Sequence, residues 1–318
     1  MKKKIPVRII TGFLGSGKTT FLNHFLKSKN NERIVVIENE IGKINIDGAT
    51  LVTNTNDIIE LTAGCICCSL NDELFEVLEE LYVKKDEIDR ILIETTGIAD
   101  PGAIAATFLN HPAVIKDFEL INVIGVIDVL FIESWLIETE EAIRQIAASD
   151  ILLLNKSDQL SDEGKKMDLT VLLSKINPLA TILWGSFGTF PLTEILERQH
   201  VQLPEMKLNS VSGSLNNIHE KITTFSFTFS NPFVLAKLNF EINRLLFLSY
   251  HQIYRIKGII AVENYPVKLI FQTVKTQVNY NDGQLWAIDE PRISKIVVIG
   301  KNINKDNMHH FFQKCLSV

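Results

Sequence analysis

An eight-residue glycine-rich motif limits the folds open to this chain more than any other feature. Residues Gly12-Phe13-Leu14-Gly15-Ser16-Gly17-Lys18-Thr19 match the pattern G-x-x-x-x-G-K-[ST] in full. The motif follows an apolar run over residues 7–11 and opens a stretch of helical spacing over residues 18–26. A strand, a glycine-rich turn and a helix in this order are what a phosphate-binding loop requires, so the sequence predicts a P-loop fold.

Each part of this motif has a chemical use. Glycines let the backbone turn tightly, so that its N–H groups face phosphate oxygens, and the following helix adds the positive end of its dipole. Lys18 is expected to bridge the β- and γ-phosphates, and the Thr19 hydroxyl to ligate Mg²⁺. The residues expected to bind nucleotide here are Gly12, Phe13, Leu14, Gly15, Ser16, Gly17, Lys18, Thr19 and Thr20.

The first 200 residues alternate apolar runs with helical patterns, which is typical of a mostly parallel sheet covered by helices. The expected strands cover residues 7–11, 33–37, 90–93, 120–127, 150–154 and 180–184. The expected helices cover residues 18–26, 71–81, 134–148 and 162–175. The fold class is therefore α/β, a P-loop NTPase domain over residues 1–200.

The pattern changes after residue 200, and a chain of 318 residues is long enough for one or two domains of ~150 residues. Residues 201–221 are rich in Asn, Ser, Gly and Pro and are interpreted as a linker. Residues 222–318 predict a C-terminal α+β domain of ferredoxin-like type, in the order βαββαβ. Its expected strands cover 222–229, 253–262, 267–274 and 294–299, and its expected helices 232–249 and 303–316.

Composition excludes several classes of protein. Hydrophobic residues make up 46% and charged residues 22%, and 32 Lys and Arg against 38 Asp and Glu leave a net charge of −6. No basic surface is indicated for nucleic acid or an anionic membrane. The longest apolar stretch, residues 118–131, contains Glu119 and Asp128 and is too short to span a bilayer. We expect a cytoplasmic chain without nucleic-acid or membrane partners.

The motif Asn155-Lys156-Ser157-Asp158 predicts which base is bound. It follows an expected strand, where a loop would lie beside a purine. The Asp158 carboxylate can accept both N1–H and N2–H of guanine, whereas adenine offers neither donor. Asn155 and Lys156 would support the base edge and the ring face, so GTP is favoured over ATP.

A third motif, Glu94-Thr95-Thr96-Gly97, follows the expected strand 90–93. Many P-loop enzymes place an Asp and then a Gly here, to hold Mg²⁺ through water and sense the γ-phosphate. Glu94 can take that role or orient the attacking water, so the expected catalytic residues are Lys18, Thr19 and Glu94. The alternative is a helix N-terminus capped by Thr95 or Thr96.

Three of the four cysteines, Cys65, Cys67 and Cys68, lie within four residues. Three thiolates, or two and a carboxylate, bind Zn²⁺ and also suit Co²⁺ or Ni²⁺. The sequence lacks a second pair of cysteines to close a structural zinc site, and an open coordination position suits metal transfer. Glu38 and Glu40 follow the second expected strand and could ligate Mg²⁺ or complete the metal site. The alternatives are buried apolar cysteines or redox-active thiols.

Taken together, these motifs resemble the CobW family of metallochaperone GTPases. The resemblance lies in segments 11–20, 38–42, 64–68, 94–97 and 155–158, and continues more weakly through 255–258, Trp286 and 299–300. It implies a GTPase that binds Zn²⁺ or Co²⁺ through Cys65, Cys67 and Cys68, with Glu38 nearby, and delivers it to a client protein. Lys43 departs from members that carry a further acidic residue, and the histidine-rich tract of many members is absent.

We hypothesise that GTP·Mg²⁺ orders the loops around Glu38, Glu40 and Glu94, and that hydrolysis loosens them and releases the metal. No arginine finger or catalytic glutamine can be assigned, so slow intrinsic hydrolysis is expected, accelerated by a homodimer or a client. One alternative is a regulatory or redox-sensing GTPase whose cysteines carry no metal. Another is a metal buffer with a vestigial nucleotide site.

Overall fold

The computed structural model describes residues 4–29, 32–38, 60–61, 70–97, 99–191, 193, 195, 222–249 and 251–317. The chain divides into two units, Met1–Val171 with Ala180–Val201, and Leu172–Leu179 with Gln202–Val318. The expected linker, 201–221, lies outside the described residues. Each unit has a sheet of its own.

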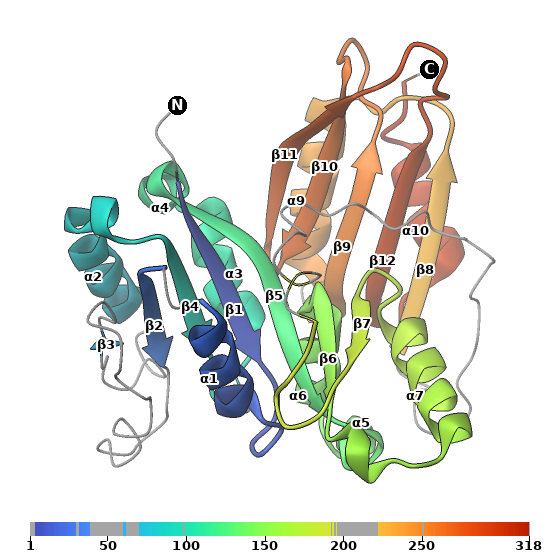
Figure 1. Ribbon diagram of the computed structural model, residues 1–318. Helices are drawn as coiled ribbons and strands as arrows, with labels where there is room; N and C mark the ends of the chain where they lie inside the picture. The colour runs from blue at the N-terminus through green and yellow to red at the C-terminus, as the bar shows by residue number, and fades with distance from the viewer. Residues whose placement is uncertain are drawn as a thin grey trace. The chain divides into compact units, whose positions relative to one another are not determined.

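The sheet of the first unit is parallel throughout, and β1 lies at its centre between β4 and β5 (Figure 1). Its strand order is β3-β2-β4-β1-β5-β6-β7. The strands are β1 (Ile5–Thr11), β2 (Ile34–Glu38), β3 (Glu60–Leu61), β4 (Arg90–Glu94), β5 (Phe118–Asp128), β6 (Ile151–Asn155) and β7 (Thr181–Trp184). The predicted strands are confirmed, with bounds within about two residues. The short β3 was not predicted.

The helices of this unit differ from expectation, because one expected helix is divided into two and both α3 (Pro101–Asn110) and the short α4 (Pro112–Asp117) were not predicted. The helices are α1 (Lys18–Ser28), α2 (Leu70–Val83), α3, α4, α5 (Ile132–Glu138), α6 (Glu140–Ala148) and α7 (Glu163–Ile176), whose residues from Leu172 onward belong to the second unit. The single helix expected over 134–148 is wrong, because Thr139 is extended and its hydroxyl caps α6 by accepting from the Ala142 N–H. Nearly every residue of α3 is buried, so it shows no amphipathic pattern and was missed.

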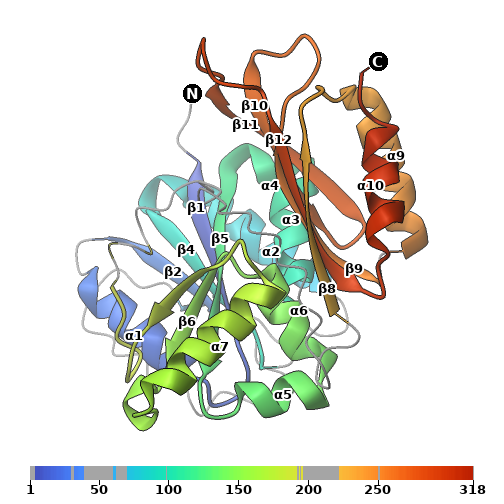
Figure 2. The ribbon, with the colours of Figure 1, turned by 90° about the vertical axis from the view of Figure 1, so that its right-hand side faces the viewer.

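Helices cover both faces of the parallel sheet. Phe21, Leu22 and Phe25 of α1 pack in one buried cluster with alternate residues of the strands, Ile10 and Val36 among them. The helices α3 and α6 pack against β5 from the other side (Figure 2). Burial on both faces explains why these strands are apolar almost throughout. In the part of the chain that the structure describes, no helix is long and apolar enough to cross a membrane.

The second unit contains an antiparallel sheet of order β11-β10-β9-β12-β8. Its elements are β8 (Ile222–Phe229), α9 (Leu235–Ser249), β9 (Ile253–Ile260), β10 (Val267–Val274), β11 (Gln277–Leu285), β12 (Ser294–Lys301) and α10 (Lys305–Gln313). The α+β class is confirmed, and the order is βαββββα. The expected strands and helices lack only β11, whereas the ferredoxin-like order βαββαβ is wrong. Strand β11 was missed because it is polar and largely exposed, and its turn at Lys275 lacks the Asn-Gly type of hairpin signal.

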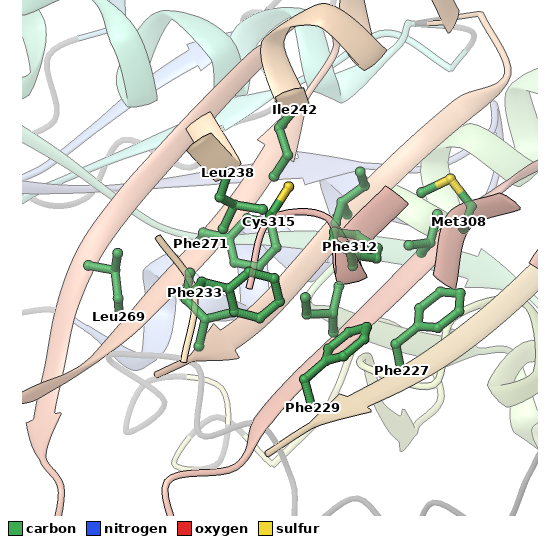
Figure 3. Close-up of a cluster of buried hydrophobic side chains, with 14 of the residues drawn as sticks. Phe227, Phe229, Phe233, Leu238, Ile242, Leu269, Phe271, Met308, Phe312 and Cys315 are labelled. Carbon is green, nitrogen blue, oxygen red and sulfur yellow. The ribbon is translucent and has the colours of Figure 1, made fainter. Parts of the chain in front are cut away.

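The core of this unit lies between the sheet and its two helices. Figure 2 shows α9 and α10 side by side on one face of the sheet. The cluster drawn in Figure 3 combines aliphatic and phenylalanine side chains, and Phe229, Phe233 and Phe312 in it lie within ring-contact distance. Cys315 is buried in the same cluster. Burial raises the pKa of its thiol to about 11.

A variant with Cys65, Cys67 and Cys68 changed to Ala tests this burial, because Cys315 is then the remaining thiol. A pKa raised from 9.0 to about 11 leaves about 100-fold less thiolate at pH 8 than in the unfolded chain. We expect iodoacetamide to label Cys315 at least about 100-fold more slowly in the native variant than in the guanidinium-unfolded variant. Mass spectrometry of timed samples measures the two rates. Equal labelling rates would contradict the buried position.

Candidate nucleotide-binding site

The glycine-rich turn connects β1 to α1 as the sequence predicts. Three of its glycines have positive φ, 146° at Gly12, 76° at Gly15 and 99° at Gly17. A Cβ on Gly12 would lie 2.2 Å from the Val126 carbonyl oxygen of β5, so the close packing of this turn on the sheet requires glycine. At Gly15 a Cβ would meet nothing within 4 Å, which leaves this side of the turn open.

Lys18 and Thr19 begin α1 and place two different groups at the turn. The Lys18 ammonium donates to the carbonyl oxygens of Gly12, at 2.9 Å, and Phe13, at 3.2 Å, and the residue is 7% exposed. Its charge is therefore held inside the turn. The Thr19 hydroxyl donates to Glu94 Oε1 at 3.2 Å. A hydroxyl beside a carboxylate is a donor set suited to a hard cation such as Mg²⁺.

Glu94 is the last residue of β4 and lies in register with Ile10 of β1 and Glu38 of β2. The chain after it stays close to the glycine-rich turn. Thr95 donates its N–H to the Ile10 oxygen at 2.9 Å, and a Cβ on Gly97 would lie 2.6 Å from Leu14 N. The alternative role as a helix cap is wrong for Thr95 and Thr96, because Asp100 caps α3 by accepting from Gly102 N–H at 2.8 Å.

Asn155, at the end of β6, connects two loops. Its side-chain amide donates to the Ser16 oxygen at 2.9 Å and accepts from the Gly188 N–H at 3.1 Å, and the residue is 2% exposed. A Cβ on Gly17 would lie 2.2 Å from Asn155 Nδ2. Asn155 therefore binds the glycine-rich turn to the loop after β7.

Lys156 and Asp158 are positioned by partners that sequence reasoning missed. Lys156 has a left-handed backbone, φ 63°, and its ammonium pairs at 2.6 Å with the carboxylate of Asp128, which is 1% exposed. Asp158 is exposed, and its N–H donates to Ser186 Oγ at 3.1 Å. Ser186 also shares a hydrogen bond of 2.8 Å with Ser157. Asp128 comes directly after the expected strand 120–127, and Ser186 comes two residues after the expected strand 180–184. Their positions at strand ends could have identified them.

A further residue, Gln145 of α6, contacts the loop after Glu94 from the side of the helix. Its side-chain N–H groups donate to the oxygens of Gly97, at 3.1 Å, and Ala99, at 3.3 Å. Nothing in the sequence distinguishes this glutamine from other helical polar residues, so its contact is a product of tertiary packing.

Phe13 anchors the glycine-rich turn to α5. Its ring stacks on Trp135 with centroids 4.5 Å apart, and Trp135 stacks in turn on Phe131 at 5.8 Å. The next residue, Leu14, is 84% exposed. Of the expected nucleotide-binding residues, Thr20 is exposed in the first turn of α1, and Ser16 is buried beneath the turn.

The expected metal ligands Cys65, Cys67, Cys68 and Glu40 lie outside the described residues, as does the side chain of Glu38. Within the described ranges, no group of three or more His, Cys, Asp or Glu side chains could hold a metal ion. The strands that precede the cysteines, β2 and β3, lie within the described residues. Ile37 of β2 is in register with Leu61 of β3, and Glu38 with Glu94, so β2 and β3 end at the edge where the glycine-rich turn lies.

Changing Asn155 to Ala tests the connection between the two loops. The Ser16 oxygen and the Gly188 N–H lose a buried partner, so we expect a loss of about 1–3 kcal/mol in the free energy of unfolding of the nucleotide-free protein. Urea denaturation measures it. Asn243→Ala is the matched control, because that exposed amide bonds within α9 to Asn239. Equal stability of the two variants would show that the connection is energetically unimportant.

Comparison with known proteins agrees with this geometry. The profile of the CobW/HypB/UreG nucleotide-binding domain matches residues 6–184, and that of the cobalamin synthesis protein CobW C-terminal domain matches residues 222–316. The chain is 28% identical over 315 residues to the zinc chaperone YjiA of Escherichia coli, covering 97% of this chain and 98% of that protein. It is 30% identical over 340 residues to the zinc chaperone CobW of Pseudomonas aeruginosa, covering 95% and 89%.

Among solved structures, the Zn(II)-bound YjiA GTPase from E. coli matches with a TM-score of 0.71 and 26% identity, over 99% of this chain and 100% of that one. Both domain profiles match in the same order as the two sheets of the structure. The chain therefore belongs to the CobW family.

Proposed function

We propose that this protein is a GTP-hydrolysing metallochaperone that binds Zn²⁺ through Cys65, Cys67 and Cys68 and transfers it to a client protein. Co²⁺ is the second candidate metal. The observation that carries the proposal is the shared edge of the parallel sheet. β1 leads into the glycine-rich turn there, and Glu94, β2 and β3 end there, β3 being the strand that precedes the cysteine-containing segment.

The protein is a P-loop GTPase of the CobW family, and its described residues fit a nucleotide with Mg²⁺. The open side at Gly15 and the enclosed Lys18 ammonium suit phosphate oxygens, and Thr19 with Glu94 suits the cation. When bound, Mg²⁺ supplies positive charge to the phosphate oxygens. Two carbonyl oxygens already restrict the Lys18 side chain in the nucleotide-free protein. Little further side-chain entropy is therefore lost when its ammonium binds phosphate.

The base side of the site supports guanine. The Asp158 carboxylate is exposed while its backbone is held by Ser186, so it is free to accept two N–H groups from a base. Pairing with buried Asp128 fixes the Lys156 side chain, whose methylene groups can then cover the ring face. Adenine would leave the Asp158 carboxylate without a donor.

The cysteines are chemically suited to the metal and close to the nucleotide in the chain. Cys65 is four residues beyond Leu61, the last residue of β3. Four residues span at most about 14 Å, so a metal on these thiolates would lie within reach of the edge that carries Glu94. Relatives named zinc chaperones match nearly the whole length of the chain, which favours Zn²⁺.

This proximity predicts that the two ligands influence each other. If nucleotide orders the loops at the shared edge, Zn²⁺ affinity will differ between states loaded with GDP and with a non-hydrolysable GTP analogue. A coupling of typical size changes the affinity about 5- to 150-fold, and Zn²⁺ must change the nucleotide affinity by the same factor. Competition with a chromogenic zinc chelator measures the first effect, and nucleotide titration with and without Zn²⁺ measures the second.

Three variants separate the parts of this proposal. The Cys65/Cys67/Cys68→Ala variant should lose tight Zn²⁺ binding, whereas Cys315→Ala, which removes a buried cysteine elsewhere, should keep it. Lys18→Ala should retain Zn²⁺ but lose the dependence on nucleotide. Equal Zn²⁺ affinity in the two nucleotide states would refute the coupling. If the Cys65/Cys67/Cys68→Ala variant hydrolyses GTP at the wild-type rate and the wild-type protein binds no Zn²⁺, a regulatory or redox-sensing GTPase is favoured instead.

A further inference from the structure

We propose that Gln145 is the positioning residue that holds segment 94–99 against the glycine-rich turn and thereby sets the rate of GTP hydrolysis. Its effect on the rate rests on the function proposed above. Its effect on the position of the segment stands on contacts within the first unit alone.

The burial of Gln145 indicates that its amide has a use. The residue is 1% exposed and lies on the apolar face of α6, among Ala142, Ile143 and Ile146. A buried amide is costly unless its polar atoms are hydrogen-bonded, and an aliphatic side chain would suit this face better. Both bonds from its nitrogen go to main-chain oxygens of one segment, Gly97 and Ala99.

That segment connects β4 to α3, and the structure describes its residues 94–97 and 99. Thr95 donates to Ile10 near its start, and Ala99 donates to Thr96 at 3.1 Å within it. On the side of the glycine-rich turn, the backbone of Gly97 lies so close to Leu14 that a Cβ would approach Leu14 N to 2.6 Å. Gln145 of α6 holds the same residue by its main-chain oxygen.

Segment 94–99 is therefore held between α6 and the glycine-rich turn. At its start, Glu94 accepts from the hydroxyl of Thr19. Loss of the Gln145 amide would release the side facing α6 but leave Lys18 and Asn155 untouched. Nucleotide affinity should then survive, whereas turnover should fall, because displacement of a reacting group by about 1 Å costs up to 100-fold in rate.

The test compares two variants of the same helix. Gln145→Met keeps the length of the side chain and removes both donors. Ser149→Ala removes a different buried hydrogen bond, in which the Ser149 hydroxyl donates to the main-chain oxygen of Gln145 at 2.7 Å. We expect Gln145→Met to lower kcat for GTP about 10- to 100-fold, with KM for GTP and Kd for GDP changed about twofold or less. Ser149→Ala should leave all three constants near those of the wild type.

Unchanged kcat in Gln145→Met, or an equal loss of kcat and GDP affinity, would overturn the proposal. Hydrogen exchange of nucleotide-free protein provides a readout that needs no turnover. Peptides covering residues 95–102 should exchange faster in Gln145→Met and not in Ser149→Ala, and equal exchange in the two variants would overturn the positioning role. If the wild type hydrolyses no GTP, the proposed function fails, and hydrogen exchange alone decides whether Gln145 positions the segment.

Discussion

Parallel pairing of β1 with β4 and β5 is the interaction on which the rest of the site depends. Because parallel strands run the same way, their carboxyl ends meet at one edge, and every residue that leaves a strand there faces the same space. At Gly12 the chain leaves β1 so close to the Val126 oxygen of β5 that a Cβ would lie 2.2 Å from it, and this position therefore requires glycine. The turn that follows then encloses the Lys18 ammonium.

Side chains that end neighbouring strands join this edge into one network. Glu94 accepts a hydrogen bond from the hydroxyl of Thr19 in the first turn of α1, and Asn155 donates to the oxygen of Ser16. Asp128 forms an ion pair with Lys156. The bonds from Glu94 and Asn155 go to α1 and to the turn before it, and the Asp128–Lys156 pair joins the ends of β5 and β6. A displacement of one of these segments therefore changes the contacts of its neighbours. Such an arrangement is suited to report the state of a bound nucleotide to the strands β2 and β3 at the same edge.

The C-terminal unit has a different physical basis. Its antiparallel sheet buries one face under α9 and α10 through a cluster rich in phenylalanine, so its stability rests on apolar packing. The polar contacts of the candidate nucleotide-binding site, by contrast, belong to the first unit. The profile of the CobW C-terminal domain matches the second unit, but fold class alone does not assign a role to it.

The sequence by itself determined the P-loop, the parallel strands and the order of the motifs. These features are local, because a glycine-rich turn, a continuous apolar run and an Asn-Lys-x-Asp segment each carry their signal in a few adjacent residues. It did not reveal the break at Thr139, the mostly buried α3 or the polar strand β11, since each lacks the periodic pattern that marks its class.

Only the tertiary structure decided which distant side chains meet. Gln145 and Gly97 are 48 residues apart, and Lys156 and Asp128 are 28 apart. No local pattern specifies these pairs, because the crossovers of the parallel sheet and the packing of α6 bring them together. The sequence predicts a nucleotide loop and a cysteine motif, and the register of β2, β3 and β4 is what places β3, the strand before that motif, at the edge where the glycine-rich turn lies.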